Sequence, residues 1–477
     1  MINYKNFVNA KKSLIIAPAW YWKTHTISES LKHTNGRQLI LTHTHAWISS
    51  IKEKLKKANI SSKNYNVETI SSFAQKFVIS FYIWDDIPNQ EDTQNYYFFI
   101  IAKATELFKL NLIQNIINIS YSWLFVDEYQ DCTESQHNLI LELSNILPTH
   151  ILWDYLQWIF NFNPVDDPII NLEDNEKLKD FYDNFQELEI PWRWKIWWNE
   201  DLWLELKNIR WKLNKKENID LNIYEQITFI KTDDIYRGLA YSKIFKIIIE
   251  NKNLLIINSI STSINTRISF LRKFKNSCFL LESIDDRDFY SFSKKLDSFT
   301  KESIYKDIIG LSSKILSSKT ELRKWFNLKN NSLKSKRNIE DKKILDNVKK
   351  IFIKIEENFS YNLIAHLLIL ISKIPNIKIY RKDLFYSLVK SLKDAEFENI
   401  SVYEAMVNKR NLIRRIWNRI EWRCVGTTLL TKWLEFDTVL IINAHKFECP
   451  KDLYVALTRA SNKLIIFSES NILSPYK

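Results

Sequence analysis

An acidic pair at the end of an apolar run is the clearest sign of chemistry in this 477-residue chain. The octet LFVDEYQD occupies positions 124–131, so Asp127 and Glu128 follow a stretch that predicts a buried strand. An isolated Asp-Glu pair is more often a solvent-facing strand end, but the full octet is much more specific. Such a pair suits nucleotide hydrolysis: Asp127 would bind Mg²⁺ through water, and Glu128 would orient or deprotonate the attacking water.

A second candidate constellation lies near the amino terminus. APAWYWKTHT (17–26) follows an apolar run, and with glycine in place of Trp20 and Trp22 it would have the GxGKT pattern of a phosphate-binding loop. Such a loop needs glycine because its backbone N–H groups turn inward around phosphate oxygens. Lys23 would reach the β- and γ-phosphates, and Thr24 would hold Mg²⁺ together with Asp127. The predicted ATP-binding loop comprises Ala17, Pro18, Ala19, Trp20, Tyr21, Trp22, Lys23 and Thr24.

Alternating strand-like and helix-like stretches would position these residues. Strands are predicted at 13–17, 39–43, 67–70, 123–126 and 150–153, with helices from Lys23, at 47–58, over most of 73–120 and at 134–147. After Pro191 the pattern restarts, with a helix at 199–213 and strands at 222–231, 253–258, 276–281, 424–430, 439–443 and 464–468. The Lys/Ser-rich stretch 286–400 is predicted to be mostly helical. The alternation predicts an α/β fold with parallel sheets, interrupted by a helical insertion.

Composition limits the partners and the location. The formal net charge is +12 and the pI about 9.1. This excess suits nucleic acid, although a coding bias toward Lys, Ile and Asn would produce it too. The four cysteines are scattered without a CxxC pair, so no zinc site, iron–sulfur cluster or disulfide is expected. No apolar run is long enough to span a bilayer, and residues 1–12 lack the apolar core of a signal peptide, so we expect a cytoplasmic location.

A series of segments resembles, in order, the motifs of UvrD/Rep-type superfamily 1 DNA helicases. DEYQD (127–131) resembles the second motif of that family and follows the candidate loop by about a hundred residues. The other matching segments are LTHTHAW (41–47), TISSFAQKF (69–77), LWDYLQWIFNF (152–162), IPWRW (190–194), VGTTLLTKWLEFD (425–437) and LYVALTRAS (453–461). Each could be plain packing by itself, but their joint order indicates the family.

The resemblance implies a role for each matched residue. Gln157 would sense the γ-phosphate, Arg193 would reach it, and Arg459 would act as an arginine finger. These three join Asp127 and Glu128 as the predicted catalytic residues. Trp192 would stack on adenine, and Glu435 would lie near the ribose. DNA contacts are implied for Thr42, His43, Thr44, Ser72, Phe73, Phe160 and Phe162, of which the last two would stack on bases.

The resemblance also implies two RecA-like P-loop domains with ATP between them. Residues 1–190 would form the first, with a short helical insertion near 80–120. Residues 191–274 and 401–477 would form the second, with 275–400 as its helical insertion. Family members generally move 3′ to 5′ on single strands. The implied function is therefore ATP-dependent translocation on DNA, with ATP and Mg²⁺ as cofactors and single-stranded DNA or single/double-strand junctions as partners. Both insertions are short for the family, so duplex unwinding is supported less well than translocation.

Tryptophan replaces glycine at motif after motif. Average usage would give roughly 33 glycines in a chain of this length, but there are 4, against 17 tryptophans. The substituted motif positions are Trp20, Trp22, Trp47, Trp153 and Trp433, with Trp158, Trp417 and Trp422 at more variable ones, whereas Trp192 and Trp194 fit the PWRW pattern. Our hypothesis is that UGA codons, read as glycine in the source lineage, are written here as tryptophan. UGG codons at Trp20 and Trp22 would refute it.

Two other functions remain open. One is a nucleic-acid-binding protein without enzymatic activity on a decayed helicase scaffold. Trp20 and Trp22 taken literally favour it, since they put large indoles where the backbone must approach the nucleotide. Lys23, Asp127 and Arg459 argue against decay, because a drifting ATPase should lose charged catalytic groups too. The other is a nucleotide-dependent signalling or nuclease-linked ATPase, for which the sequence offers no specific motif.

Overall fold

The computed structural model describes residues 3–18, 23–43, 45–84, 86–88, 93–159, 167–171, 176–188, 199–260, 263–275, 277–282, 287–316, 319–327, 332–415, 423–432 and 434–476. The chain divides into two compact units. The first comprises Met1–Ile235, Asn253–Ile260 and Thr427–Lys477, and the second comprises Tyr236–Lys252 and Ser261–Gly426.

The first sheet is six-stranded, with the order β3-β2-β4-β5-β1-β6 and parallel pairing throughout. Its strands are β1 (Lys12–Ile16), β2 (Gln38–Thr42), β3 (Tyr65–Thr69), β4 (Trp123–Val126), β5 (Thr149–Trp153) and β6 (Phe185–Glu187). Apolar side chains on both faces of β1 to β5 are buried, whereas Phe185 of the edge strand β6 is exposed and this strand was not predicted. Leu14 and Leu39 belong to one hydrophobic cluster, while the adjacent Ile15 and Ile40 belong to another. Burial on both faces explains why the strands are nearly continuous apolar runs.

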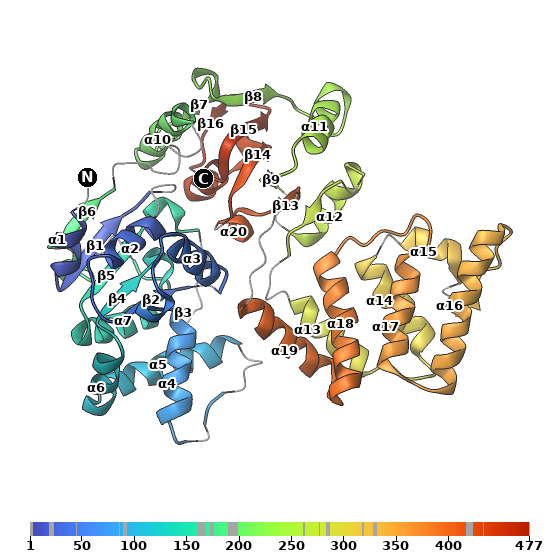
Figure 1. Cartoon of the computed structure of the whole chain (residues 1–477). Helices are drawn as coiled ribbons and strands as arrows, with labels where there is room; N and C mark the ends of the chain where they lie inside the picture. The colour runs from blue at the N-terminus through green and yellow to red at the C-terminus, as the bar shows by residue number, and fades with distance from the viewer. Residues whose placement is uncertain are drawn as a thin grey trace. The chain divides into compact units, whose positions relative to one another are not determined.

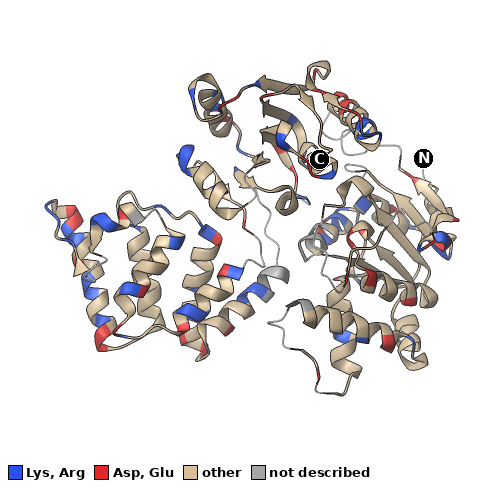
Figure 2. Ribbon diagram, turned by 180° about the vertical axis from the view of Figure 1, so that it is seen from behind, with Lys and Arg blue, Asp and Glu red and all other residues tan. Residues whose placement is uncertain are grey.

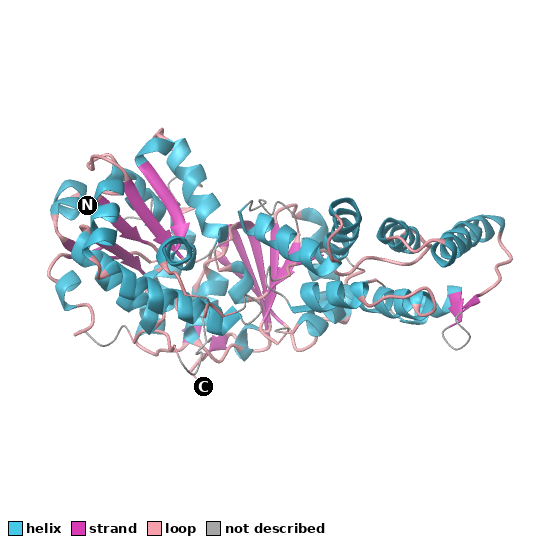
Figure 3. Ribbon diagram, turned by 90° about the horizontal axis from the view of Figure 1, so that it is seen from below, coloured by secondary structure: helices cyan, strands magenta, loops and turns pink. Residues whose placement is uncertain are grey.

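Two groups of helices cover this sheet, one on each face (Figures 1 and 3). Helices α1 (Tyr4–Asn9), α2 (Lys23–Leu31) and α3 (His45–Lys57) contribute to one cluster. Helices α4 (Ile70–Phe81), α5 (Thr93–Phe108), α6 (Asn111–Ser120), α7 (Glu134–Ile146) and α8 (Lys179–Tyr182) contribute to the other. A capping box of Thr133 and Gln136 fixes the start of α7 directly after the acidic octet.

The second sheet has the order β10-β13-β9-β14-β15-β8. Its strands are β8 (Ile227–Lys231), β9 (Leu254–Asn258), β10 (Phe279–Leu280), β13 (Cys424–Gly426), β14 (Phe436–Ile442) and β15 (Ala460–Ser468). The associated helices are α10 (Glu200–Asn214), α11 (Gly238–Glu250), α12 (Ile264–Lys273), α20 (Thr428–Thr431) and α21 (Pro450–Leu457). A two-stranded antiparallel ribbon joins β7 (Ile219–Asp220) to β16 (Ile472–Leu473).

Two predicted strands of this region are wrong in part. Residues 221–223 form a 3₁₀ turn, so the strand predicted at 222–231 begins only at Ile227. The strand predicted at 424–430 ends at Gly426, because the Thr427 side chain accepts a hydrogen bond from the Leu430 amide and starts α20.

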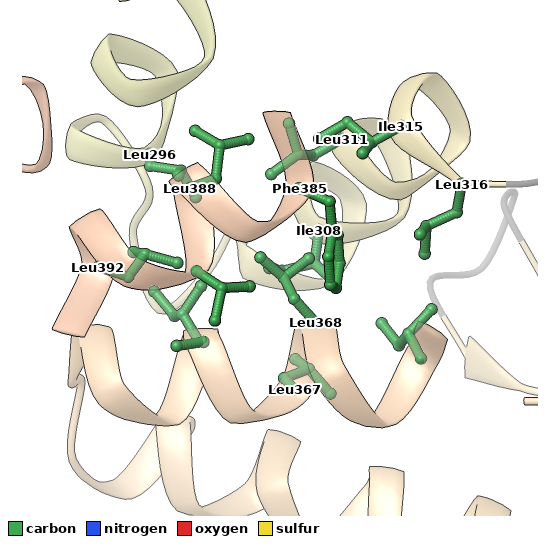
Figure 4. Packing of buried hydrophobic residues seen from close by; sticks show 14 of the residues in the cluster. Leu296, Ile308, Leu311, Ile315, Leu316, Leu367, Leu368, Phe385, Leu388 and Leu392 are labelled. Atoms are coloured by element: carbon green, nitrogen blue, oxygen red, sulfur yellow. The ribbon is translucent and has the colours of Figure 1, made fainter. Parts of the chain in front are cut away.

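A helical region of the second unit has a core of its own (Figure 4). It contains α13 (Arg287–Asp297), α14 (Ile304–Ile315), α15 (Lys319–Trp325), α16 (Ile339–Glu357), α17 (Tyr361–Ser372), α18 (Lys382–Glu398), α19 (Val402–Arg415) and a hairpin of β11 (Phe326–Asn327) and β12 (Ser332–Leu333). Leu296, Ile308, Leu368, Phe385 and Leu388 pack together from four of these helices. None of the described helices is long and apolar enough to cross a membrane.

The predicted fold class is therefore confirmed. Two six-stranded sheets with parallel pairing and flanking helices form an α/β architecture consistent with two RecA-like domains, and a mostly helical stretch follows α12.

Left-handed backbone positions in the described part of the chain fall mostly on residues other than glycine. Asn59, Asn376, Asn399 and Asn443 have positive φ, as do Lys216 and Lys275. Asn tolerates this region better than most residues, because its short side chain bonds locally. Asn399, for example, ends α18 in the left-handed conformation that glycine usually supplies. This use of Asn suits a chain with so few glycines.

We expect substitution by alanine to have opposite effects on stability at two of the glycines. Gly36 has φ +72° and a Cβ there would meet Ser122 Oγ at 2.3 Å, so Gly36→Ala should destabilise the protein by about 1–3 kcal/mol. Gly310 lies inside α14 with only Lys295 Nζ at 4.0 Å, so Gly310→Ala should stabilise it by about 0.5–1 kcal/mol. Urea unfolding of the two variants measures both changes. Equal changes in the free energy of unfolding would contradict the expectation that backbone conformation decides the effect at each glycine.

Candidate active site

Four charged residues follow the carboxyl ends of three neighbouring strands. In the first sheet β5 lies between β1 and β4. Lys23 begins α2 after β1, Asp127 and Glu128 directly follow β4, and Asp154 directly follows β5. Because parallel strands present their carboxyl ends at one edge, these side chains meet where α/β proteins commonly bind ligands.

Lys23 and Glu128 form a buried ion pair. Lys23 Nζ lies 2.7 Å from Glu128 Oε2, and the two side chains are 7% and 3% exposed. Burial disfavours the charge of Lys23, but Glu128, Asp127 and Asp154 together raise its pKa above the ordinary value. Burial likewise opposes the charge of Glu128, yet Lys23 and then Lys432 hold its pKa at about 2. Both groups are therefore charged near neutral pH.

The backbone at Glu128 is in a conformation that side chains rarely adopt. Glu128 has φ 56° and ψ 40°, in the left-handed region. Its amide donates to Asp127 Oδ1 at 2.9 Å, and the Asp127 amide donates to the Leu41 carbonyl of neighbouring β2 at 2.9 Å. Such strain persists only where the surroundings enforce it, and it is concentrated at functional sites. Here it aims two adjacent carboxylates into one cluster.

A chain of hydrogen bonds links the ends of β4 and β5. Gln130 Nε2 donates to Glu128 Oε2, while Gln130 Oε1 accepts from the Asp154 amide at 3.1 Å. Gln157 Nε2 donates to Asp154 Oδ2 at 2.8 Å. All four side chains are buried. Of the predicted residues, Lys23, Asp127, Glu128 and Gln157 are thus brought together.

Helices associated with the second sheet extend this network. Arg210 of α10 donates through one Nη1 to Asp154 Oδ1 at 2.8 Å and to the Tyr454 hydroxyl of α21 at 3.0 Å. The Arg210 guanidinium also lies 5.3 Å from the centre of the Tyr454 ring. Burial opposes its charge, but Asp154 and then Tyr454 raise the pKa of Arg210. Sequence reasoning missed both residues: Tyr454 lies inside the matched segment LYVALTRAS (453–461) but was given no role, and no motif marks Arg210.

Removing Arg210 should leave the buried Asp154 carboxylate without its cation. We expect Arg210→Ala to lower the free energy of unfolding by about 2–3 kcal/mol, measured by urea denaturation. Lys207→Ala, an exposed cation on the same helix, should change it by no more than about 0.5 kcal/mol. Asp154→Asn combined with Arg210→Ala should cost less than the two single changes added together. Additive costs would show that the two residues do not interact.

A second ion pair joins the octet to the segment before β14. Lys432 Nζ contacts Asp131 Oδ2, and both side chains are buried. Burial raises the pKa of Asp131 to about 7, even though Lys432 acts in the opposite direction. This pair was not predicted, although both residues lie inside matched motifs.

Arg459 lies close to this pair but bonds mainly to backbone carbonyls. Its Nε donates to the Val455 carbonyl at 3.0 Å, and its Nη1 donates to the carbonyls of Lys432 and Leu434. Burial lowers the pKa of Arg459 to about 10, which leaves it charged at neutral pH. Glu435, also predicted, is exposed at the start of β14.

The predicted DNA-contacting residues fall in different surroundings. Thr42 is buried at the end of β2. Burial lowers the pKa of the adjacent His43 to about 3, and His43 Nε2 lies 3.4 Å from Cys132 Sγ. Ser72 is half-buried in the first turn of α4, where Thr69 caps the helix. Phe73 is 1% exposed and packs on Phe77 and Phe108 in the core, so we leave it out of the proposed DNA surface.

Several predicted residues lie outside the described part of the chain. Ala17 and Pro18 are described and buried at the end of β1, and the Ala17 amide donates to the Trp153 carbonyl at 2.9 Å. Thr24 is described only as part of α2. The residues outside are Ala19, Trp20, Tyr21, Trp22, Thr44, Phe160, Phe162, Trp192, Arg193 and Trp433.

The residues present fit a magnesium–nucleotide ligand. Asp127 offers a fully buried carboxylate, the ligand type that Mg²⁺ prefers. Lys23 offers three ammonium donors at the start of a helix, where backbone N–H groups also favour an anion. Near them lie Lys432 and Arg459, two further buried cations. The cluster can therefore balance a polyanion and bind its metal ion.

Comparisons with known proteins were made by sequence and by structure. No model of a protein family matches the chain, and no curated protein matches it. The helicase nonstructural protein 10 of an arterivirus aligns at 10% identity and a TM-score of 0.33, covering 98% of this chain and 62% of its own. Its complex with DNA aligns at 10% identity and a TM-score of 0.34, covering 97% and 62%.

A structure of Pif1 helicases at forked double-stranded DNA aligns at 11% identity and a TM-score of 0.35, covering 100% of this chain and 94% of the other. The chain thus spans 62% of the length of the two arterivirus structures. Superposition at this level does not define the fold, which rests on the strand order and pairing given above.

Proposed function

We propose that this chain is an ATP-dependent DNA translocase of the UvrD/Rep type within helicase superfamily 1, moving 3′ to 5′ on single-stranded DNA. One observation carries the proposal: the buried Lys23–Glu128 ion pair lies beside Asp127 at the carboxyl edge of the first sheet. Structural ion pairs seldom combine a strained acidic residue, a second buried carboxylate and a lysine at a helix start. A phosphate-hydrolysing site needs a lysine for the phosphates, a carboxylate for the metal ion and a residue that positions the attacking water.

ATP with Mg²⁺ would supply the phosphoanhydride bond whose hydrolysis drives movement. Lys23 would bind phosphate oxygens, Asp127 would hold the metal ion, and Gln157 would contact the terminal phosphate. Glu128 would accept a proton from the attacking water. Lys23 now lowers the pKa of Glu128. When Lys23 turns to a phosphate, that pKa should rise, so substrate binding would itself strengthen the base.

Contacts with the second sheet's helices would couple hydrolysis to movement. Asp154 and Asp131 bond Arg210 and Lys432, and Arg459 lies against the Lys432 carbonyl. A change in charge at the cluster would therefore alter contacts between elements of both sheets. Cyclic opening and closing of such contacts is how a nucleotide cycle can step a protein along a strand.

The carboxyl ends of β2 and β3 form the proposed DNA contact in the first sheet. His43 follows β2, and Ser72 lies in the first turn of the helix that follows β3. Thr42, the buried last residue of β2, is left out of the proposed DNA surface for the same reason as Phe73. His43 and Ser72 would bind single-stranded DNA or a single/double-strand junction, and the net charge of +12 would assist.

The proposal is tested with protein carrying glycine at positions 20 and 22. ATP hydrolysis should rise on addition of single-stranded DNA and much less with blunt duplex. The protein should displace streptavidin from a 5′-biotinylated strand faster than from a 3′-biotinylated one, as 3′-to-5′ movement requires. Hydrolysis that is unaffected by DNA would refute the proposal, and the reverse displacement preference would refute its direction.

A second candidate function is nucleic-acid binding without hydrolysis. Trp20 and Trp22 favour it if the protein really contains tryptophan there. DNA binding that persists without any ATPase activity, even after both positions are changed to glycine, would establish it.

A further inference from the structure

One strongly basic segment of the chain lies at residues 236–275. Residues 236–275 contain eight Lys or Arg and a single acid, Glu250, whereas the whole chain has 68 Lys or Arg against 56 Asp or Glu. The segment covers α11, β9 and α12. In Figure 2, α12 ends in blue and carries no red. Residues 308–339 also contain eight Lys or Arg and one acid, Glu321, so the excess by itself does not distinguish 236–275.

Four exposed cations lie at the end of α12 or in the segment that bonds to it, and we call this group the α12 basic surface. It comprises Arg272, Lys273, Lys275 and Lys378. Lys378 Nζ donates to the Lys275 carbonyl at 3.5 Å, which joins the segment before α18 to the end of α12. Lys275 has φ +55°, and this left-handed turn ends the helix.

Aromatic rings lie beneath these cations. The Arg272 guanidinium lies 4.7 Å from the centre of the Tyr380 ring, and Lys275 Nζ lies 5.2 Å from that of Phe245. Lys273 Nζ lies 5.7 Å from the Tyr236 ring. A ring under a flexible basic side chain limits its motion while leaving its N–H donors free to bind an anion. The surface is therefore partly ordered in advance.

Stabilisation of α12 explains only some of the cations in the α12 basic surface. Cations in the last turn stabilise the helix dipole, which accounts for Arg272 and Lys273. Lys275 and Lys378 lie beyond the helix. Of the acids that follow in sequence, Glu282 and Asp288 both pair with the buried Arg381, so these two do little to neutralise the α12 basic surface. Asp285 and Asp286 lie outside the described residues.

We propose that the α12 basic surface is a second binding site for the phosphodiester backbone of single-stranded DNA, separate from the contacts that follow β2 and β3. Several cations presented on aromatic supports suit a row of phosphates better than a single carboxylate. The inference rests on the proposed translocase function, because DNA is the polyanion which that function requires. The site would bind without reading sequence, since it offers charge and no arrangement for base edges.

The test compares two triple variants of the full chain with glycine at positions 20 and 22. Arg272→Gln, Lys273→Gln and Lys275→Gln remove three charges from the α12 basic surface. Lys342→Gln, Lys343→Gln and Lys349→Gln remove three exposed charges from α16 in the same unit and serve as the matched control. Thermal melting followed by circular dichroism confirms that both variants fold.

Binding of a labelled oligothymidylate is measured at several salt concentrations. Each phosphate contact on a single strand contributes about 0.7 to the slope of log K against log salt, so the first variant should lose a slope of about 2 and bind more weakly at low salt. The control should match the parent. Equal losses in both variants would show a general charge effect and overturn the inference, as would unchanged binding of the first variant.

The parent protein, which carries glycine at positions 20 and 22 and no other change, separates the proposed translocase function from the proposed second DNA site. If the parent hydrolyses ATP faster with DNA but the first triple variant binds DNA normally, only the second site is wrong. If the parent neither binds DNA nor responds to it, both proposals fail.

Discussion

Substitution of Glu128 by glutamine should slow ATP hydrolysis by about 10²–10⁴-fold in protein with glycine at positions 20 and 22, because the attacking water loses its proton acceptor. Glutamine retains an oxygen that can accept the bond from Gln130. It also leaves Asp127 and Asp154 near Lys23, both of which favour the lysine's charge. Nucleotide affinity should therefore change little. Phosphate release gives the rate, and titration with a fluorescent ATP analogue gives the affinity.

The matched control for this substitution is Glu142→Gln. Glu142 lies on α7 of the same unit and pairs with Lys109 at 3.8 Å, away from the cluster. The Glu142→Gln variant should hydrolyse ATP at the same rate as the protein with glycine at positions 20 and 22 and no other change. If Glu128→Gln retained most of the activity, Glu128 would be a structural partner of Lys23, and the Glu128 role in the proposed function would be wrong.

Five strands of the first sheet, β1 to β5, could be predicted from sequence because each is buried on both faces. The short edge strand β6 is largely exposed and was not predicted. The strand at Trp123–Val126 was predicted with its observed bounds, and the helix that follows begins as predicted at Glu134. Both are marked by strong local signals, a continuous apolar run and a capping box. The end of β13 could not be predicted in this way. Leu429 and Leu430 continue its apolar run, but the Thr427 cap turns them into a helix.

The local part of the site was equally accessible from sequence. Asp127 and Glu128 are neighbours in the chain and follow β4. Gln157 follows β5, which lies beside β4, and Lys23 follows β1, on the other side of β5. Motif reasoning therefore brought them together, although their roles stay predictions. Arg210 could not be found because its partner Asp154 is 56 residues away. Nothing in an amphipathic helix tells which of its cations will be buried on a carboxylate.

At Phe73 the motif and the burial of the side chain point to different roles. Its place in TISSFAQKF predicted a DNA contact, yet Phe73 and Phe77 lie four residues apart on α4 and pack together in the core. Aromatics at helical spacing are more often packing residues than ligands. Side-chain type alone could not distinguish the two roles, whereas burial does.

Glycine at positions 20 and 22 should strengthen ATP binding by at least about 100-fold relative to the chain with both tryptophans. A phosphate-binding loop gives two or more charge-assisted backbone hydrogen bonds, each contributing about 1.5–3 kcal/mol, and bulky side chains in the loop would prevent them. A gain of about 3 kcal/mol corresponds to roughly two powers of ten in affinity. Titration with a fluorescent ATP analogue measures the difference between Trp20→Gly/Trp22→Gly and the chain as written.

Trp84→Gly/Trp211→Gly is the matched control, because both of these tryptophans are exposed and lie outside the motifs. It should bind ATP as weakly as the chain as written, despite the cost of about 1 kcal/mol for glycine within α10. A gain confined to positions 20 and 22 would show that the surrounding lysine and carboxylates are still arranged for a nucleotide. Such an arrangement is what recoding of glycine codons predicts, since the catalytic charges would have remained under selection. No gain at either pair of positions would instead favour a scaffold that has lost hydrolysis and kept only its binding surfaces.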